Sequence, residues 1–435
     1  MTFDELGLAP ILCKTVAGLG YSSPTPIQVQ AIPMALEGHD LLAGAQTGTG
    51  KTAAFALPII ERLMIHGAPR KTVSRRPRSL VLVPTRELAN QVHESFRSLA
   101  TGTGLLSATV FGGVGMEPQV RALNRGLDLV VATPGRLIDH MERGTVNLSG
   151  VEILTLDEAD RMLDMGFLPS IRRILAAAQT NRQTLLFSAT LLPQIKVLAA
   201  QFMKNPKEVQ VSAVNSIAAT IAHRVHPVSA DRKRDLLVHL LGRNTHQALI
   251  FCRTKHGSDK LCRHLSDGGF RAEAIHGNKS QGARTRSLAD FKAGRTRLLV
   301  ATDLAARGLD IQQLPMVINF DLPMVPQDYI HRIGRTGRAG VEGHAVSLVS
   351  REERGLLGDI QRLLAGQIEI SAVAGFEPSN APSRANATPR PPATPFRAAT
   401  PERQARVGYA FRPGGARSER STRDSGNRSR HKTGR

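Results

Sequence analysis

A glycine-rich turn and a pair of carboxylates, far apart in the chain, have the residue types that phosphate chemistry needs. Asp157 and Glu158 follow the apolar run 153–156, and two such carboxylates can hold magnesium and orient an attacking water. Backbone amides of the turn can hold a triphosphate while its lysine reaches the terminal phosphates. The turn consists of Ala45, Gln46, Thr47, Gly48, Thr49, Gly50, Lys51 and Thr52. The sequence therefore predicts a triphosphate site with Mg²⁺.

Each half of this pattern has a plainer explanation when it is taken alone. An acidic tetrad can form the first turn of a helix and complement the helix dipole. The glycine-rich turn also departs from the general P-loop pattern, because Ala45 stands where the first glycine belongs. The surrounding sequence favours the phosphate site, since a short strand at 40–43 precedes the turn and an apolar helix from Ala53 follows it.

The composition is typical of a globular protein with a polyanionic partner. Of the 435 residues, 41% are hydrophobic, no apolar run approaches a membrane span, and the N-terminus lacks a signal-peptide pattern. The net charge is +21, and residues 371–435 carry 13 Lys or Arg against 4 Asp or Glu. The three cysteines form no CxxC pair, and the nearby cysteines and histidines at 252–264 fit no common zinc spacing. We expect a cytoplasmic protein without a membrane partner.

Short apolar strands alternate with helical patterns, which predicts parallel α/β sheets. Besides 40–43, the expected strands lie at 80–83, 129–131, 153–156 and 184–187, and then at 248–252, 298–301, 317–320 and 345–349. In such sheets, ligands bind beyond the carboxyl ends of the strands, so polar groups that follow the strands should gather at one rim. Those of the first half are Pro84-Thr85-Arg86, Thr133-Pro134-Gly135-Arg136, Asp157-Glu158 and Ser188-Ala189-Thr190. Ordinary turn chemistry could explain any one of them, but not readily all four.

The second half of the chain shows no second glycine-Lys-Thr turn, so we expect no nucleotide site of its own there. Residues 208–218 form a plausible linker between the halves. From 376 to 435, Pro, Ala, Ser, Gly and Arg dominate without periodicity, which predicts a disordered basic tail.

Three arginines lie within the eight residues 331–338. Such a run can be a solvated helix face or a nonspecific nucleic-acid patch. The glycine spacing favours a turn that presents fixed guanidinium groups to a transferring phosphoryl group, as an arginine finger does. If the finger comes from the second half, hydrolysis requires the two halves to close.

In these motifs the chain resembles the DEAD-box RNA helicases, from residue 1 to about 375. Segments 161–167 and 275–284 are most similar to the bacterial RhlE group. The resemblance implies two RecA-like parallel-sheet domains in tandem, at 1–207 and 219–375, with a Q motif at about 1–29. It also implies that ATP and RNA bind on opposite sides of the cleft between them.

The resemblance assigns roles to single residues. Lys51 and Thr52 would hold phosphates and Mg²⁺, Asp157 would meet the metal's water shell, and Glu158 would position the water. The remaining nucleotide contacts would be Phe3 on adenine, Gln28 at the adenine edge, Asp310 at the ribose, and Arg335 and Arg338 at the γ-phosphate. Hydrolysis would be coupled to strand separation through Ser188, Ala189 and Thr190.

Single-stranded RNA and short duplexes are the implied partners. Aromatic residues are only 4% and tryptophan is absent, so base stacking is a poor source of affinity, and binding should be independent of RNA sequence. The contacts would come from Pro84, Thr85, Arg86, Gly112, Gly113, Thr133, Pro134, Gly135 and Arg136 in the first domain. In the second domain they would come from Arg253, Thr254, Gln281, Arg284 and Thr302.

These residues predict an ATP-dependent RNA helicase that locally unwinds or remodels duplexes. An ATP-gated RNA clamp or annealing factor would use the same residues, and a DNA translocase is a further alternative that the region of Phe3 and Gln28 disfavours. The tail 376–435 would hold RNA through phosphate charge, or it would be a solvating extension with no specific role. Ribosomal or RNA-decay assemblies are candidate partners.

Overall fold

The computed structural model describes most of the chain up to residue 378. The described residues are 1–45, 48–65, 76–191, 193–211, 221–306, 309, 311, 314–337, 342–364, 366 and 368–378. Several predictions fall outside them and stay predictions: those for Gln46, Thr47, Asp310 and Arg338, for the linker beyond residue 211, and for the tail from residue 379.

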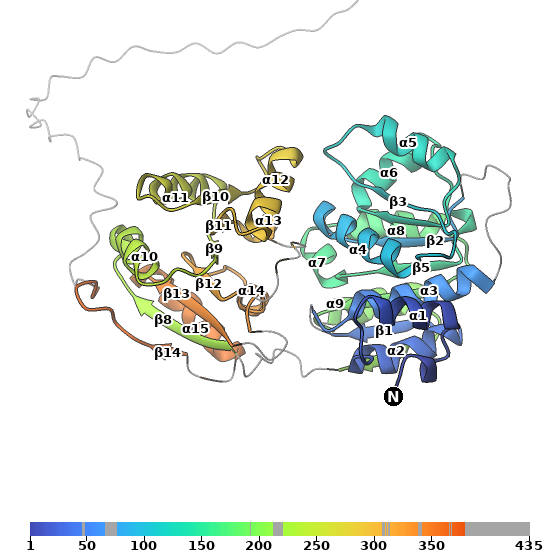
Figure 1. Cartoon of the computed structure of the whole chain (residues 1–435), viewed down its shortest axis with the longest axis horizontal. Coiled ribbons are helices and arrows are strands. Elements are labelled where there is room, and N and C mark those ends of the chain that lie inside the picture. The colour runs from blue at the N-terminus through green and yellow to red at the C-terminus, as the bar shows by residue number, and fades with distance from the viewer. Residues whose placement is uncertain are drawn as a thin grey trace, which may run out of the picture. The chain divides into compact units, whose positions relative to one another are not determined.

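Within these residues, the first half of the chain forms a sheet of seven parallel strands in the order β3-β4-β2-β5-β6-β1-β7. Figure 1 labels β1, β2, β3 and β5 of this sheet and the helices around it. The strands are β1 Leu41–Gly44, β2 Ser79–Leu82, β3 Ser107–Val110, β4 Leu129–Ala132, β5 Ile153–Leu156, β6 Gln183–Ser188 and β7 Lys207–Gln210. We call this sheet and its helices the first lobe.

The second half forms another parallel sheet of seven described strands, in the order β10-β11-β9-β12-β13-β8-β14. The strands are β8 Ile221–Pro227, β9 Ala248–Phe251, β10 Ala272–Ile275, β11 Leu298–Ala301, β12 Met316–Asn319, β13 Gly343–Val349 and β14 Glu369–Ile370. This sheet and its helices form the second lobe. Numbered from its first strand, each sheet has the same order, so the fold is a tandem repeat of one α/β architecture.

Helices cover both faces of the first sheet because its strand residues alternate between two cores. Val81 of β2 packs into the core with α1–α4, whereas its neighbours Leu80 and Leu82 pack into the core with α5–α9. The helices are η1 Asp4–Leu6, α1 Pro10–Gly18, α2 Pro26–Leu36, α3 Lys51–Ile65, α4 Arg86–Leu99, α5 Met116–Asn124, α6 Pro134–Glu142, η2 Leu148–Gly150, α7 Ala159–Asp164, α8 Leu168–Ala177 and α9 Pro193–Phe202.

The second sheet shows the same alternation. Ile250 of β9 packs with α10 and α11, whereas Leu249 and Phe251 pack with α12 and α13, and α14 and α15 enclose a third cluster. The helices are η3 Ala230–Arg232, α10 Lys233–Gly242, α11 Lys255–Asp267, α12 Gln281–Lys292, α13 Asp303–Ala306, α14 Pro326–Ile333, η4 Arg351–Glu353 and α15 Arg354–Leu363.

The expected parallel α/β class is confirmed, and every predicted strand overlaps an observed one. The strands that the sequence did not reveal include all four edge strands, β3, β7, β10 and β14. An edge strand is not buried like a central one, so it lacks a continuous apolar run: β7 buries only Val209. This strand also takes up the first three residues of the predicted linker 208–218.

Asp40 joins three strands of the first sheet through its buried carboxylate. Oδ1 accepts a hydrogen bond from the Thr184 amide at the start of β6 (2.7 Å), and Oδ2 accepts one from the Lys204 amide just before β7 (2.6 Å). Because Asp40 immediately precedes β1, these bonds fix how β1 sits between β6 and β7.

We expect Asp40→Ala to lower the free energy of unfolding by about 2–4 kcal/mol, because two buried amides lose a charged acceptor. Asp40→Asn keeps one acceptor oxygen and should lose about half as much. Urea titration followed by circular dichroism suits this chain, which has no tryptophan. Asp139→Ala, at a half-exposed carboxylate, is the control, and equal stability of Asp40→Ala and the control would contradict the role.

Candidate functional site

The first sheet brings the phosphate turn and the carboxylates to the carboxyl ends of three adjacent strands, β1, β6 and β5. Lys51 and Thr52 begin α3, which follows β1 after the turn. Asp157 and Glu158 directly follow β5, and Ser188 ends β6 between these two strands. All strands are parallel, so these groups share one rim, as the spacing of the motifs predicts.

The site holds buried charged atoms that have no hydrogen-bond partner in the described part of the chain. Burial raises the pKa of Asp157 to about 6, the Lys51 charge opposes this shift, and the Glu158 charge adds to it. Among the described residues, Lys51 Nζ and Glu158 Oε2 are buried without a hydrogen-bond partner. Such atoms cost folding free energy. Their arrangement is therefore one that a bound polar ligand would stabilise.

Glu158 also has an unusual backbone. Its φ of 53° places it in the left-handed region, which it shares with Asn205 alone among the described non-glycine residues. Its backbone amide donates to Oδ1 of Asp157 (2.9 Å), so the Asp157 carboxylate is held against the backbone of Glu158. Backbone strain of this kind concentrates at functional sites.

Asp160, to which the sequence analysis gave no role, joins the carboxylate segment to the Ser188–Thr190 segment. Its Oδ2 accepts hydrogen bonds from the amide and the hydroxyl of Thr190, both at 3.2 Å. Ser188 in turn donates from Oγ to the Thr190 carbonyl (2.7 Å). The two motifs are thus connected directly, and their positions at the ends of adjacent strands were the signal for this contact.

The residues predicted for adenine have internal partners in this structure. Gln28 is fully buried, accepts from the Thr25 amide (2.9 Å) and donates to the Gly50 carbonyl (3.1 Å). It therefore holds the end of the phosphate turn, where Gly50 has a φ of 91°. Phe3 lies in the core of the first lobe, edge-on to Tyr21.

The three RNA-binding segments predicted in the first lobe meet at the other end of the same rim. Arg136 donates from Nη1 to the Val114 carbonyl (3.1 Å), just beyond the two glycines. Gly113 has a φ of 77°, and a Cβ there would lie 1.9 Å from Nη1 of Arg86, so only glycine fits. Thr85 caps α4 by accepting from the Leu88 amide (3.3 Å).

In the second lobe, Arg253, Thr254 and Thr302, which are predicted to bind RNA, also lie just after the ends of strands. Arg253 follows β9, donates from its amide to Asp321 (2.9 Å) and from Nη2 to Glu353 (2.9 Å). Thr254 caps α11 through the Gly257 amide (3.0 Å), and Thr302 follows β11. These contacts fix the backbone of the segment.

Several ion pairs and hydrogen bonds join residues of the two lobes. Gln281 accepts from Arg86 Nη1 (3.2 Å) and donates to Glu87 (2.9 Å), which Arg284 also meets at 3.2 Å. A further buried pair links Arg161, directly after Asp160, to Asp328 on α14 (2.9 Å). Sequence reasoning did not single out Glu87, Arg161 or Asp328.

Arg335 follows α14 and is buried. Its Nη1 donates to the Leu309 carbonyl (2.8 Å). This contact lies within the second lobe.

Gln119 on α5 and His140 on α6 are buried polar residues that contact each other, and the sequence patterns did not single them out. The sequence signal that could have revealed them is a polar residue on the buried face of each helix, where the other buried residues are apolar.

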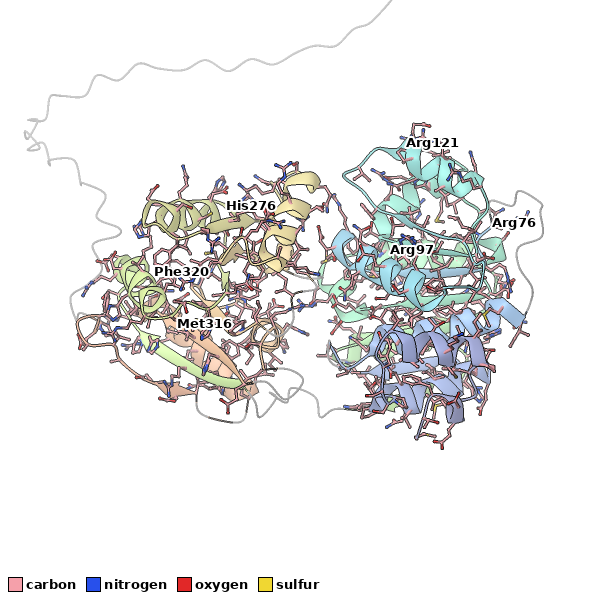
Figure 2. All side chains as sticks on the ribbon, in the orientation of Figure 1. Arg76, Arg97, Arg121, His276, Met316 and Phe320 are labelled. Atoms are coloured by element: carbon pink, nitrogen blue, oxygen red, sulfur yellow. The ribbon has the colours of Figure 1, made fainter. Side chains whose placement is uncertain are left out.

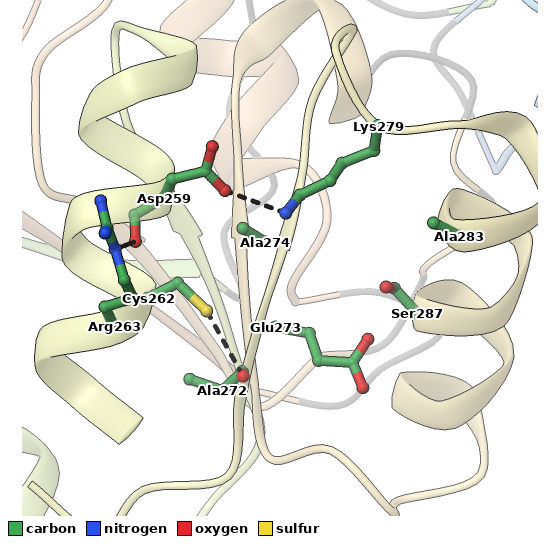
Figure 3. Close-up of a pocket in the computed structure, with 9 residues that line it drawn as sticks. All are labelled: Asp259, Cys262, Arg263, Ala272, Glu273, Ala274, Lys279, Ala283 and Ser287. Atoms are coloured by element: carbon green, nitrogen blue, oxygen red, sulfur yellow. Dashed lines mark hydrogen bonds and ion pairs between the residues drawn. The ribbon is translucent and has the colours of Figure 1, made fainter. Parts of the chain in front are cut away.

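A hollow of about 600 Å³ lies between α11, β10 and α12 (Figure 3). None of the predicted site residues lines it. Asp259 at its edge pairs with Lys279 (3.0 Å) and lies 3.0 Å from Nε2 of His276, which Figure 2 labels. The described part of the chain contains no group of three or more His, Cys, Asp or Glu residues that could hold a metal. It also has no helix long and apolar enough to cross a membrane.

Together, the parallel sheet, the glycine-rich turn at its rim and the adjoining carboxylates define a P-loop nucleoside triphosphatase. The second lobe repeats the fold without such a turn among its described residues. Comparison with known sequences identifies the family within this class.

Family models match both lobes. The model "DEAD/DEAH box helicase" matches residues 25–198, and "Helicase conserved C-terminal domain" matches residues 232–340. The DEAD-box ATP-dependent RNA helicase CshA of Geobacillus kaustophilus is 42% identical over 85% of this chain and 78% of that protein. DEAD-box ATP-dependent RNA helicase 30 of Arabidopsis thaliana is also 42% identical, over 84% of this chain and 62% of that protein.

Solved structures agree with these matches. S. cerevisiae Dbp5 bound to RNA and ADP BeF3 has a TM-score of 0.76 and 32% identity, over 87% of this chain and 95% of that one. The chain therefore belongs to the DEAD/DEAH box helicase family, and its activity is that of a DEAD-box ATP-dependent RNA helicase.

Proposed function

We propose that the helicase closes two domains, at 1–207 and 219–375, around ATP and single-stranded RNA, and that hydrolysis lets them reopen. The closed cleft holds a bent strand that a duplex cannot follow, so a few base pairs are lost. One observation carries this proposal: among the described residues, Lys51 Nζ and Glu158 Oε2 are buried without hydrogen-bond partners. A bound triphosphate would accept from the lysine, and the attacking water would donate to the glutamate.

Release of a labelled strand from a short RNA duplex tests the proposal. ATP should speed release, and a DNA duplex should be a poorer substrate. ATP-dependent retention of single strands without any release would favour a clamp instead.

In this proposal the phosphates lie on Gln46, Thr47 and Lys51, with Thr52 and Asp157 holding Mg²⁺. When bound, Mg²⁺ neutralises charge that develops on the phosphate oxygens. A hydroxyl and one buried carboxylate suit Mg²⁺, which keeps waters and phosphate ligands rather than an all-protein cage. Glu158 would position the water.

The remaining nucleotide contacts follow the motifs. Phe3 and Gln28 would select adenine, Asp310 would meet the ribose, and Arg335 and Arg338 would stabilise the γ-phosphate in transfer. For Arg335 this requires release of its hydrogen bond to Leu309. The Asp160–Thr190 contact supports a coupling role for Ser188–Thr190, because a shift at the carboxylates moves that segment.

RNA would bind on the amides, hydroxyls and guanidinium groups of the segments around Arg86, Gly113 and Arg136, and on Arg253, Thr254, Gln281, Arg284 and Thr302. These groups contact phosphate and sugar, which supports binding independent of sequence. The pairing of Gln281 and Arg284 with Glu87 supports a role for closure in assembling this surface.

We further infer a place beside the bacterial RhlE group, supported by segments 161–167 and 275–284. Relatives named CshA belong to the same family. The one from Listeria monocytogenes is 44% identical over 82% of this chain and 67% of that protein. A cytoplasmic location is supported by three free cysteines, and ribosomal or RNA-decay assemblies are proposed partners.

Lys51→Ala should abolish RNA-stimulated ATP hydrolysis, because the terminal phosphates lose their cation. It should not lower the melting temperature of the nucleotide-free protein, since the ammonium has no hydrogen-bond partner to lose among the residues that the structure describes. Phosphate release and thermal melting measure the two effects. Lys196→Ala, at an exposed lysine, is the control, and normal turnover by Lys51→Ala would rule out the site.

Arg335→Ala should leave ATP affinity within about threefold but slow hydrolysis by about 10³-fold or more, as loss of an arginine finger does. Arg335→Lys should recover little, because a point charge does not replace the planar fork. Single-turnover hydrolysis and nucleotide-binding titrations separate the steps. Arg362→Ala, at an exposed arginine of the same lobe, is the control. Weak binding with normal hydrolysis would contradict the role.

Removal of residues 376–435 should weaken RNA binding and flatten its dependence on salt, because fewer phosphates are then neutralised. Binding of a labelled single strand is measured from low to moderate salt. A truncated chain with the full-length salt slope would show that the tail is only a solvating extension.

A further inference from the structure

The loop 111–115, which carries Gly112 and Gly113, is held from both ends by one buried side chain. Gln119 on α5 donates from Nε2 to the Phe111 carbonyl (2.9 Å) and to the Gly115 carbonyl (3.5 Å). These two carbonyls lie on either side of the glycines. The Gln119 side chain therefore sets the spacing of the loop ends.

Gln119 is itself oriented by His140, which is fully buried on α6. Nε2 of His140 lies 3.1 Å from Oε1 of Gln119, and Nδ1 lies 2.7 Å from Oγ1 of Thr145. Carbonyls only accept, so the Gln119 amide group must face the loop and its oxygen must face His140. The ring then carries its proton on Nε2, and Nδ1 accepts from the Thr145 hydroxyl, whose single proton is shared with the His140 carbonyl (3.0 Å).

The surroundings of His140 favour this neutral ring. Burial lowers its pKa, the charges of Arg136 and Arg143 lower it further, and Asp139 opposes them. A charged ring would also carry a proton on Nδ1 and lose its acceptor role toward Thr145.

The histidine connects two of the RNA-binding segments. α6 begins with Pro134-Gly135-Arg136, and His140 lies one helical turn after Arg136, on the same side of the helix. Arg136 holds the middle of the loop through the Val114 carbonyl, while His140 holds its ends through Gln119. A shift of α6 would therefore move the glycines.

We propose that Gln119 and His140 are positioning residues that hold the backbone of Gly112 and Gly113 in the geometry that grips the RNA strand. This inference rests on the proposed function, because it assumes that these glycines contact RNA. The residues lie beyond β3 and β4, whereas the nucleotide site lies at β1, β6 and β5. Their loss should change RNA affinity without changing the chemistry on ATP.

The full-length chain is tested with an RNA-stimulated ATPase assay and a single-stranded uridine decamer. Gln119→Met and His140→Leu should each raise the RNA concentration for half-maximal stimulation by about tenfold, because buried hydrogen bonds to the loop are lost. The rate at saturating RNA and the KM for ATP should stay within about twofold of wild type.

Two variants and one control sharpen the result. His140→Gln keeps a donor near Nε2 and should restore most of the affinity. Gln119→Glu keeps the acceptor toward His140 but loses the donor to the loop, so it should fail like Gln119→Met. His93→Leu is the matched control, because His93 also has a lowered pKa and a polar partner, Ser107 (3.0 Å), in the same lobe.

Unchanged half-maximal RNA in both Gln119 variants would overturn the inference, as would equal losses in turnover and ATP affinity, which indicate a structural role only. If the variants fail to fold, nitrogen NMR of wild-type His140 decides the question. The Nδ1–H tautomer has no proton on Nε2, so it would exclude the hydrogen bond from His140 to Gln119. A wild-type chain that RNA does not stimulate would instead contradict the proposed function.

Discussion

A parallel sheet covered by helices on both faces leaves the ends of its strands as the place for polar chemistry, and the rest of this structure depends on that constraint. At the ends of β1, β6 and β5 the chain keeps a lysine and two carboxylates out of water without pairing them fully. Their desolvation costs stability, and the two apolar cores of the lobe offset that cost. A ligand that supplies the missing charges therefore binds a site that is already in place.

The same rim separates two kinds of contact. The groups proposed for the nucleotide lie at β1, β6 and β5, whereas the loop of Gly113 and the start of α6 lie past β3 and β4, at the other end of the sheet. Asp160 connects the nucleotide groups to the segment after β6, and Arg161, the next residue, pairs with Asp328 of the second lobe. Asp160 and Arg161, which are neighbours on the short helix α7, thus contact the rim of the first lobe and the second lobe, respectively.

Residue patterns predicted the central strands and the rim, because runs such as 153–156 are apolar wherever both faces are buried. They could not reveal β7 or β10, whose residues alternate or are exposed at an edge. Contacts between distant segments were also out of reach. Nothing in the sequence shows that Gln28 binds the Gly50 carbonyl, or that Gln119 and His140 meet. Such pairs depend on how the helices pack.

Strand β7 is the last part of the first sheet before the chain leaves it, and it is bonded along its length to β1. The Val211 amide extends this ladder to Gly44, at the threshold of the phosphate turn (3.2 Å). A pull on the polypeptide beyond residue 211 would therefore load β1 in shear, and β1 leads into the glycine-rich turn. Strands β7 and β1 share one hydrogen-bond ladder, so such a load would reach the glycine-rich turn through backbone hydrogen bonds alone.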